Sequence, residues 1–95
     1  MIVTWTDNAI EHLVGIYEYI SQSSPSYASK VVDRLTRRSE QLADFPLSGR
    51  KVPEYNMKGL RELVEGPYRI LYHVKTNQID VIAVMHGAQE LPALD

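Results

Sequence analysis

One arginine and one histidine stand in apolar stretches that are typical of β-strands. Arg69 interrupts the run Tyr68–Val74, and His86 follows Val84 and Met85. A charge in a buried strand is costly unless it is paired or faces a groove. An arginine in a groove can stabilise charge on a transferring phosphoryl group, and a histidine can move the proton. The pair therefore indicates a sheet face that serves as a working surface, with phosphate chemistry as one use of it.

A structural role also explains these two residues. Arg69 could pair with Glu62 or Glu65, and His86 could cap the end of a strand. On the sequence alone both interpretations stand. The chain contains no cysteine, and its three histidines lack the spacing of metal ligands. We therefore expect neither a metal site nor a cofactor.

Charge is distributed unevenly along the chain, although the net charge is only −2. All ten basic residues lie between Lys30 and Lys75, where six acidic residues leave an excess of +4. Such a basic block between acidic flanks suits an acidic partner, whereas a pI of 5.9 argues against strong non-specific binding of nucleic acid. There is neither a signal-peptide pattern nor an apolar run near the roughly 18 residues of a membrane span, so we expect a cytoplasmic protein.

The spacing of apolar residues predicts the elements that position Arg69 and His86. The order is β-α-α-β-β-β in a single domain over residues 1–95. The predicted elements are a strand at 2–5, helices at 9–20 and 25–45, a basic loop at 46–59, and strands at 60–65, 68–74 and 79–85. This pattern is typical of an α+β fold with a helical hairpin packed on one face of a small, mainly antiparallel sheet.

The short turn before residue 79 predicts how the last two strands pair. If Val74 lies opposite Ile79, a regular register places Arg69 opposite Val84, with His86 diagonal to it on the same face. The other face is then wholly apolar and packs against the helices.

The segments of this chain resemble those of the RelE/ParE superfamily of toxins from bacterial type II toxin–antitoxin systems. The resemblance covers nearly the whole chain and includes the opening strand and the helical hairpin. It is carried further by residues 45–50 (FPLSGR), 60–64 (LRELV), 66–72 (GPYRILY) and 81–87 (VIAVMHG).

The resemblance implies a cytoplasmic growth inhibitor that a cognate antitoxin neutralises within a toxin–antitoxin hetero-oligomer. In this superfamily an antitoxin segment wraps across the toxin, and DNA is contacted only indirectly, through the antitoxin. No membrane partner is implied. The basic middle of the chain would suit a predominantly acidic antitoxin segment.

Two branches of the superfamily imply different targets. ParE-like members, the plasmid-stabilisation group, poison DNA gyrase without chemistry of their own. The local sequence around Pro46, Gly66-Pro67-Tyr68 and His86-Gly87 favours this branch. RelE-like members are metal-independent endoribonucleases that cut mRNA on the ribosome. In that alternative Arg69, His86 and Glu54 would be the catalytic residues; in the favoured interpretation there is none.

The surface that contacts the target or the antitoxin is expected on the exposed sheet face, the 46–59 loop and the C-terminal tail. Its candidate residues are Arg50, Lys51, Lys58, Arg61, Arg69, His73, His86 and Gln89. Many relatives carry an arginine where this chain has Gln89. A third alternative is therefore a degenerate toxin that acts only as an antitoxin-binding co-repressor.

Overall fold

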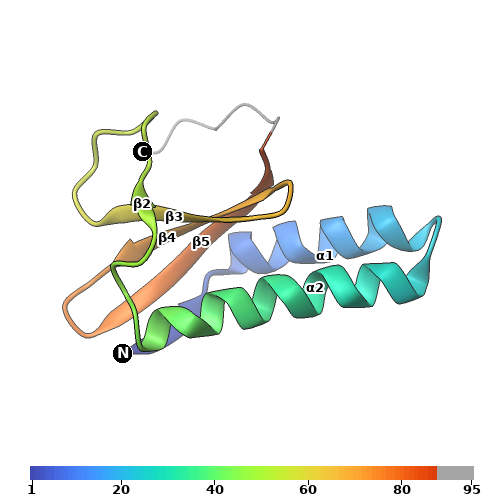
Figure 1. The fold of residues 1–95 in the computed structure, drawn as a ribbon, viewed down its shortest axis with the longest axis horizontal. Coiled ribbons are helices and arrows are strands. Elements are labelled where there is room, and N and C mark those ends of the chain that lie inside the picture. Colours follow the sequence, from blue (N-terminus) through green and yellow to red (C-terminus); the bar gives the residue numbers. More distant parts are fainter. Residues whose placement is uncertain (88–95) are drawn as a thin grey trace.

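The computed structural model describes residues 1–87 of the 95-residue chain. Its elements are β1 (Ile2–Trp5), α1 (Asp7–Ser21), α2 (Pro25–Glu40), the short 3-10 helix η1 (Gln41–Ala43), β2 (Arg50–Lys51), β3 (Leu60–Glu65), β4 (Tyr68–Val74) and β5 (Gln78–His86). In Figure 1 the hairpin of α1 and α2 lies along one face of the sheet. The predicted α+β class and element order are confirmed, with β2 as an addition inside the predicted loop.

The five strands of the described residues form one sheet in the order β1-β5-β4-β3-β2. β1 runs parallel to β5, and the other neighbours are antiparallel. The first strand of the chain therefore lies beside the last one. At the end of β1, the backbone N–H of Thr6 donates to the carbonyl of Val81 at 3.0 Å.

Both helices begin next to residues whose side chains cap them. The Thr6 hydroxyl accepts the N–H of Ala9, and the Ser24 hydroxyl accepts the N–H of Tyr27, each at 3.2 Å. Pro25 follows Ser24 at the first helical position, where a missing N–H costs nothing.

The second helix ends earlier than predicted. α2 stops at Glu40, and one turn of 3-10 helix carries the chain through Gln41–Ala43. Phe45, the last residue of the predicted helix, is 65% exposed. The apolar residues of this segment reach the core only as far as Leu42, because the chain turns away toward β2 after that residue.

The main core lies between the helices and the sheet, with Tyr72 fully buried in it. The Tyr72 hydroxyl accepts the backbone N–H of Gly49 at 2.9 Å, which ties the segment before β2 to the sheet. A Cβ atom at Gly49 would lie 2.4 Å from the carbonyl oxygen of Glu62 and 2.6 Å from the Tyr72 hydroxyl. The close approach therefore requires a glycine at this position.

A β-bulge in β5 makes the predicted register of its second half wrong. Tyr72 lies opposite Val81 as expected, but Leu71 lies opposite Ala83, so Ile82 has no partner on β4. One extra residue reverses which face the following side chains occupy.

Two residues expected against the helices change faces as a result. Ala83 and Met85 pack with Leu71 in a second apolar cluster on the opposite side of the sheet, whereas Val84 joins the helix-side core.

The sheet face away from the helices is not open, because the segment that follows β2 covers part of it. Val52 is buried in the second cluster, and Tyr55 packs against the same cluster. This small second layer of apolar side chains therefore covers the face that carries Arg69 and Leu71, and both residues are buried.

Candidate functional site

Arg69 lies at the centre of an ion-pair cluster built by four segments. From β4, its guanidinium makes a two-pronged contact with Glu54 of the covering loop, with Nη1 to Oε2 at 2.7 Å and Nη2 to Oε1 at 3.0 Å. Its Nε donates to Oε2 of Glu62 on β3 at 2.8 Å. The other oxygen of Glu62 accepts from Arg50 of β2 at 2.7 Å. The alternative that pairs Arg69 with Glu62 is confirmed, whereas Glu65 contacts Arg38.

The environment holds this cluster in its charged form. The hydrogen bonds that Arg69 donates to Glu54 raise the pKa of Arg69 above its ordinary value, against the opposing effect of burial, and Glu62 adds to the rise. The same hydrogen bonds from Arg69 lower the pKa of Glu54. The side chain of Glu62 is 0% exposed. Buried carboxylates are stable only when they are paired, so the cluster keeps Arg69 and Glu62 together.

This arrangement limits the chemistry of the predicted nuclease residues. Two edges of the Arg69 guanidinium are already occupied by carboxylates, the Nε edge by Glu62 and the Nη1–Nη2 edge by Glu54. A lowered pKa also makes Glu54 a weaker base than an ordinary carboxylate. A hollow of about 510 Å³ nevertheless adjoins the cluster, lined by Arg50, Pro53, Glu54, Val64, Arg69 and Gly87.

His86 lies on the other face of the sheet, so the predicted pairing of Arg69 with His86 is wrong. Arg69 is opposite Met85 across the strand pair, and His86 is opposite Tyr68, because the bulge shifts the register. The His86 ring meets the Tyr68 ring edge-on, with centroids 5.8 Å apart.

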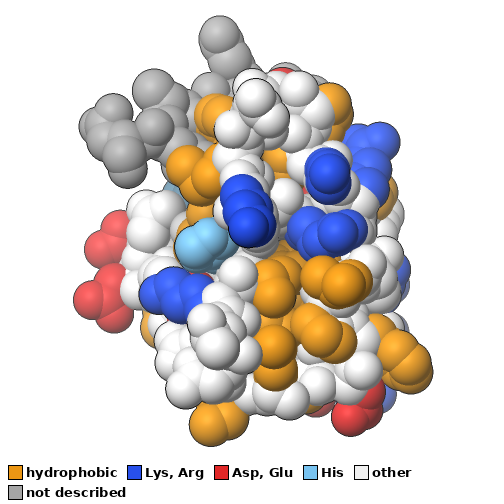
Figure 2. All heavy atoms as spheres, turned by 90° about the vertical axis from the view of Figure 1, so that its left-hand side faces the viewer, with side chains coloured by type: hydrophobic (Ala, Val, Ile, Leu, Met, Phe, Trp, Pro, Cys, Tyr) orange, Lys and Arg blue, Asp and Glu red, His pale blue; other side chains and the backbone are white. Residues whose placement is uncertain are grey.

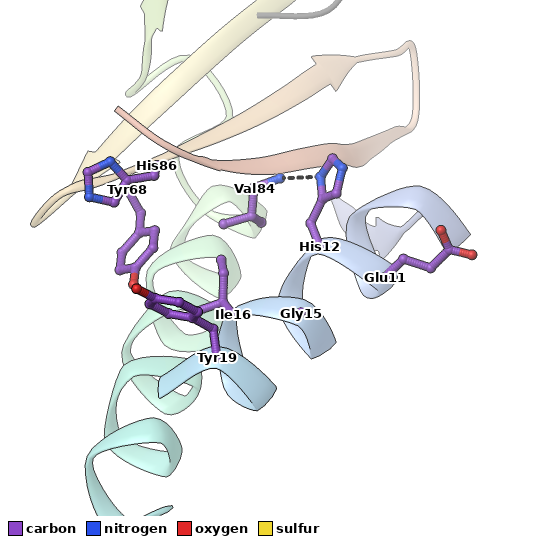
Figure 3. Close-up of a pocket in the computed structure, with 8 residues that line it drawn as sticks. All are labelled: Glu11, His12, Gly15, Ile16, Tyr19, Tyr68, Val84 and His86. Carbon is purple, nitrogen blue, oxygen red and sulfur yellow. Dashed lines mark hydrogen bonds between the residues drawn. The ribbon is translucent and has the colours of Figure 1, made fainter. Parts of the chain in front are cut away.

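A groove of about 410 Å³ runs between α1 and the ends of β4 and β5 on this helix side. Figure 3 shows the two rings at one end of the groove and His12 near the other. Its lining residues are Glu11, His12, Gly15, Ile16, Tyr19, Tyr68, Val84 and His86.

His12 contributes to this groove in a way that the sequence did not reveal. Its Nδ1 accepts the backbone N–H of Val84 at 3.2 Å. β1 pairs with β5 only as far as Val81, so the outer edge of β5 needs another partner beyond that point. His12 of α1 is this partner for the N–H of Val84. The side chains of Asn8 in α1 and of Thr6 just before it donate to the carbonyl of Ile82. Residues in and next to α1 therefore satisfy the backbone groups at this edge of the sheet.

Four of the predicted surface residues come together in a third place, at the end of the sheet where β3 begins and β4 ends. They are Lys51, Lys58, Arg61 and His73, and they line a hollow of about 760 Å³. Figure 2 looks at this end and shows Lys and Arg side chains around a histidine, beside a band of hydrophobic side chains. Lys75 of the β4–β5 turn also lines the hollow, and sequence reasoning missed it. The sequence signal that could have identified Lys75 was its position at the predicted turn before residue 79.

The structure thus divides the predicted site residues among three places. Arg50, Arg69 and Glu54 form the ion-pair cluster, His86 lies in the groove beside α1, and the remaining four described residues line the basic hollow. Gln89 lies outside the described residues.

Within residues 1–87 no cluster of His, Cys, Asp and Glu could hold a metal ion. In the same part of the chain, no helix combines the length and the apolar character that a bilayer crossing needs.

Residues 3–91 match the family model described as the ParE toxin of the type II toxin–antitoxin system parDE. The chain belongs to this family. Y4kP of Sinorhizobium fredii is 35% identical over 92 residues, which cover 95% of this chain and 92% of Y4kP. Toxin RelE2 of Caulobacter vibrioides is 35% identical over 88 residues, which cover 92% of this chain and 96% of RelE2. The chain is therefore a type II toxin of the RelE/ParE superfamily.

Three solved structures share the fold of this ParE-family chain. A structure of the chromosomal ParDE system of P. aeruginosa superposes with a TM-score of 0.76 at 25% identity, over 90% of this chain and 95% of that one. The RelBE2 toxin–antitoxin complex of Mycobacterium tuberculosis gives 0.59 at 21% identity, with coverage of 90% and 95%. The YoeB dimer of Staphylococcus aureus gives 0.60 at 20% identity, with coverage of 87% and 92%.

Proposed function

We propose that this toxin arrests growth by binding DNA gyrase, that it has no chemistry of its own, and that a cognate antitoxin neutralises it. The observation that carries the proposal is the separation of the candidate catalytic groups. Two carboxylates occupy Arg69 on one face of the sheet, and His86 lies on the other face. The match to the ParE family model supports the same branch.

The proposed partners are cytoplasmic. The antitoxin and the toxin form a hetero-oligomer, and DNA is contacted only through the antitoxin. Lys51, Lys58, Arg61 and His73 form the proposed contact surface on the described residues, since they line one hollow at the end of the sheet. Gln89 remains a candidate for the same surface.

The test is expression of the full chain without its antitoxin, with plasmid supercoiling, DNA breaks and the integrity of translated messages read from the same culture. We expect altered supercoiling or double-strand breaks while messages stay intact. Purified gyrase should lose supercoiling activity when the toxin is added. Cut messages with unperturbed DNA would overturn the proposal. Full growth arrest would also contradict the alternative of a degenerate co-repressor.

The second candidate function is ribosome-dependent cleavage of mRNA. One observation favours it: the Glu54 carboxylate directly contacts the Arg69 guanidinium at 2.7 Å beside a hollow, so a base and a charge-stabilising group adjoin. This function requires that Glu54→Gln reduces the cleavage of translated messages by at least about tenfold. His86→Ala, on the other face, serves as the comparison. Messages that stay intact with the wild-type toxin would exclude this candidate.

A further inference from the structure

The helical hairpin has an outer face, turned away from the sheet, that exposes apolar side chains. In Figure 1 the sheet lies on one side of α1 and α2, and no element of residues 1–87 lies on the other. Ile10, Val14 and Tyr17 recur at helical spacing on α1 and are 46%, 49% and 38% exposed. Tyr27 of α2 is 51% exposed. Apolar side chains that gather on a surface are typical of a contact with a partner.

The two helices carry opposite charge. α1 contains three acidic residues and no Lys or Arg, whereas α2 contains four basic residues and two acidic ones. At 100° per residue, the three acidic residues of α1 fall on the side opposite the residues that pack into the core. The outer face of the hairpin is therefore acidic along one helix and basic along the other.

Several of these charges lack a partner within the molecule. Arg37 pairs with Asp33 of its own helix at 3.0 Å. Four other exposed charges form no ion pair within residues 1–87, namely Glu11 and Glu18 of α1 and Lys30 and Arg34 of α2. These four side chains are available to a partner that presents both signs of charge.

We propose that this face binds a second copy of the chain, with α1 of each copy packed over α2 of the other. A twofold axis parallel to the helices exchanges the two helices, so the acidic one meets the basic one twice. Such a rotation keeps each residue at its height along the hairpin. Glu11 and Arg34 lie at nearly equal distances from the loop that joins the helices, so Glu11 of one copy meets Arg34 of the other.

A partner of uniform charge fits this face less well. Nucleic acid or an acidic peptide would be attracted by Lys30 and Arg34 but repelled by the acidic residues of α1. The face measures about 24 Å by 20 Å, the length and combined width of the two helices, and a typical stable interface buries about 800 Å² on each partner. We therefore expect a weak dimer, with a dissociation constant in the micromolar range.

The experiment measures the monomer–dimer equilibrium of the full chain, made by cell-free synthesis, by analytical ultracentrifugation. The acid-reversed variant is Glu11→Lys with Glu18→Lys, and the base-reversed variant is Lys30→Glu with Arg34→Glu. A third variant carries all four changes, so it keeps the net charge of the wild type and exchanges the signs of the two helices. All four positions are exposed, and circular dichroism checks that each variant is folded.

We expect the acid-reversed and base-reversed variants each to dimerise at least about tenfold more weakly than the wild type, because like charges then meet at both helix contacts. The variant with all four changes should return to within about threefold of the wild type. An equimolar mixture of the two reversed variants should form heterodimers with similar affinity, since opposite charges meet again at both contacts.

Two controls separate this pairing from the effect of net charge. Lys51→Glu with Lys58→Glu has the net charge of the base-reversed variant but leaves the hairpin unchanged, so at physiological salt it should dimerise within about threefold of the wild type. Mixed with the acid-reversed variant, this control should form fewer heterodimers than the base-reversed variant does, because one of the two helix contacts is then repulsive.

Three results would overturn the proposal. A wild type that stays monomeric at about 100 µM has no such interface. A dimer that the reversed variants form as readily as the wild type must use another surface. Finally, dimerisation of the variant with all four changes that is as weak as that of the two reversed variants would contradict the pairing of α1 with α2.

Discussion

At the scale of single residues, the arginine that resembled a catalytic group is part of the fold. Arg69 pairs with the buried Glu62 and holds the covering loop through Glu54. The sequence contained this pairing as an alternative to catalysis, because a strand cannot bury an arginine without a carboxylate nearby. It did not reveal which carboxylate. Glu62 and Glu65 lie on opposite faces of β3, and only the register of β3 against β4 shows that Glu62 shares its face with Arg69.

We predict that Arg69→Ala lowers the free energy of unfolding by about 3 kcal/mol, because Glu62 loses a buried partner. The double variant Arg69→Met with Glu62→Leu should recover most of this loss, since apolar replacement of a buried ion pair is often neutral. Chemical denaturation of the three proteins measures both effects. Loss of stability alone can abolish growth arrest in Arg69→Ala. A loss of growth arrest therefore reports on target contact only if the double variant, which recovers the stability, loses growth arrest as well. Equal stability of the wild type and Arg69→Ala would contradict the prediction.

We also predict that Gly49→Ala destabilises the protein by about 1–3 kcal/mol, the usual cost of overpacking. The added methyl group would collide with the carbonyl of Glu62 and the hydroxyl of Tyr72, and the bond between that hydroxyl and the Gly49 N–H would break. Urea midpoints at an unchanged slope give the value. Melting like that of the wild type would show that the loop moves away freely.

At the scale of elements, periodicity predicted the strands and helices well and the register only in part. The two helices begin within two residues of their predicted starts, and β3 and β4 match their predicted ranges. Alternation of side chains counts residues in steps of two, so an inserted residue such as Ile82 cannot be seen in it. The faces assigned beyond the bulge were therefore reversed, and with them the position of His86.

The basic hollow could not be predicted for a different reason. Lys51, Lys58 and Lys75 come from β2, a loop and a turn, and their approach depends on how the irregular segment 52–59 folds back. Irregular segments carry no periodic pattern from which their path could be derived.

Helix α1 offers the third prediction. Gly15 lies in the middle of this helix, and a Cβ atom there would meet nothing within 4 Å. Gly15→Ala should therefore raise the free energy of unfolding by about 1 kcal/mol through helix propensity alone. Thermal and chemical denaturation measure the change, with circular dichroism as the check that helix content is preserved. A decrease would mean that the helix needs glycine for a reason outside the described contacts.

At the scale of the whole molecule, one carboxylate joins the first and the last strand of residues 1–87. Asp80 of β5 accepts the hydroxyl of Thr4 from β1 at 2.7 Å and lies 2.5 Å from the ammonium of Lys75. The hydrogen bond from Lys75, then those from Thr4 and Gln78, lower the pKa of Asp80 to about 2. The parallel contact between β1 and β5 is stabilised by a charge that strong acid removes.

The fourth prediction concerns acid stability. Because its pKa is lower in the folded state than the ordinary 3.8, Asp80 stabilises the fold above about pH 4, and this contribution is lost as the pH falls toward 2. Asp80→Asn should be less stable than the wild type at neutral pH and should lose less stability over that range. Denaturation at a series of pH values measures both. Asp33→Asn, at an exposed pair with Arg37, is the control. Parallel curves for the wild type and Asp80→Asn would contradict the prediction.

The position of β5 within the sheet has a consequence for synthesis of the toxin. This strand bridges β1 and β4, yet it is made only after residue 77, behind all the other strands of residues 1–87. A nascent chain therefore holds β1 without a neighbouring strand until β5 has been translated, and contacts of such long sequence separation form late. A ribosome that stalls before residue 78 releases a polypeptide without the strand that joins both parts of the sheet. Translation that is interrupted before β5 should thus yield fragments that cannot fold into a toxin, so such fragments would not require an antitoxin.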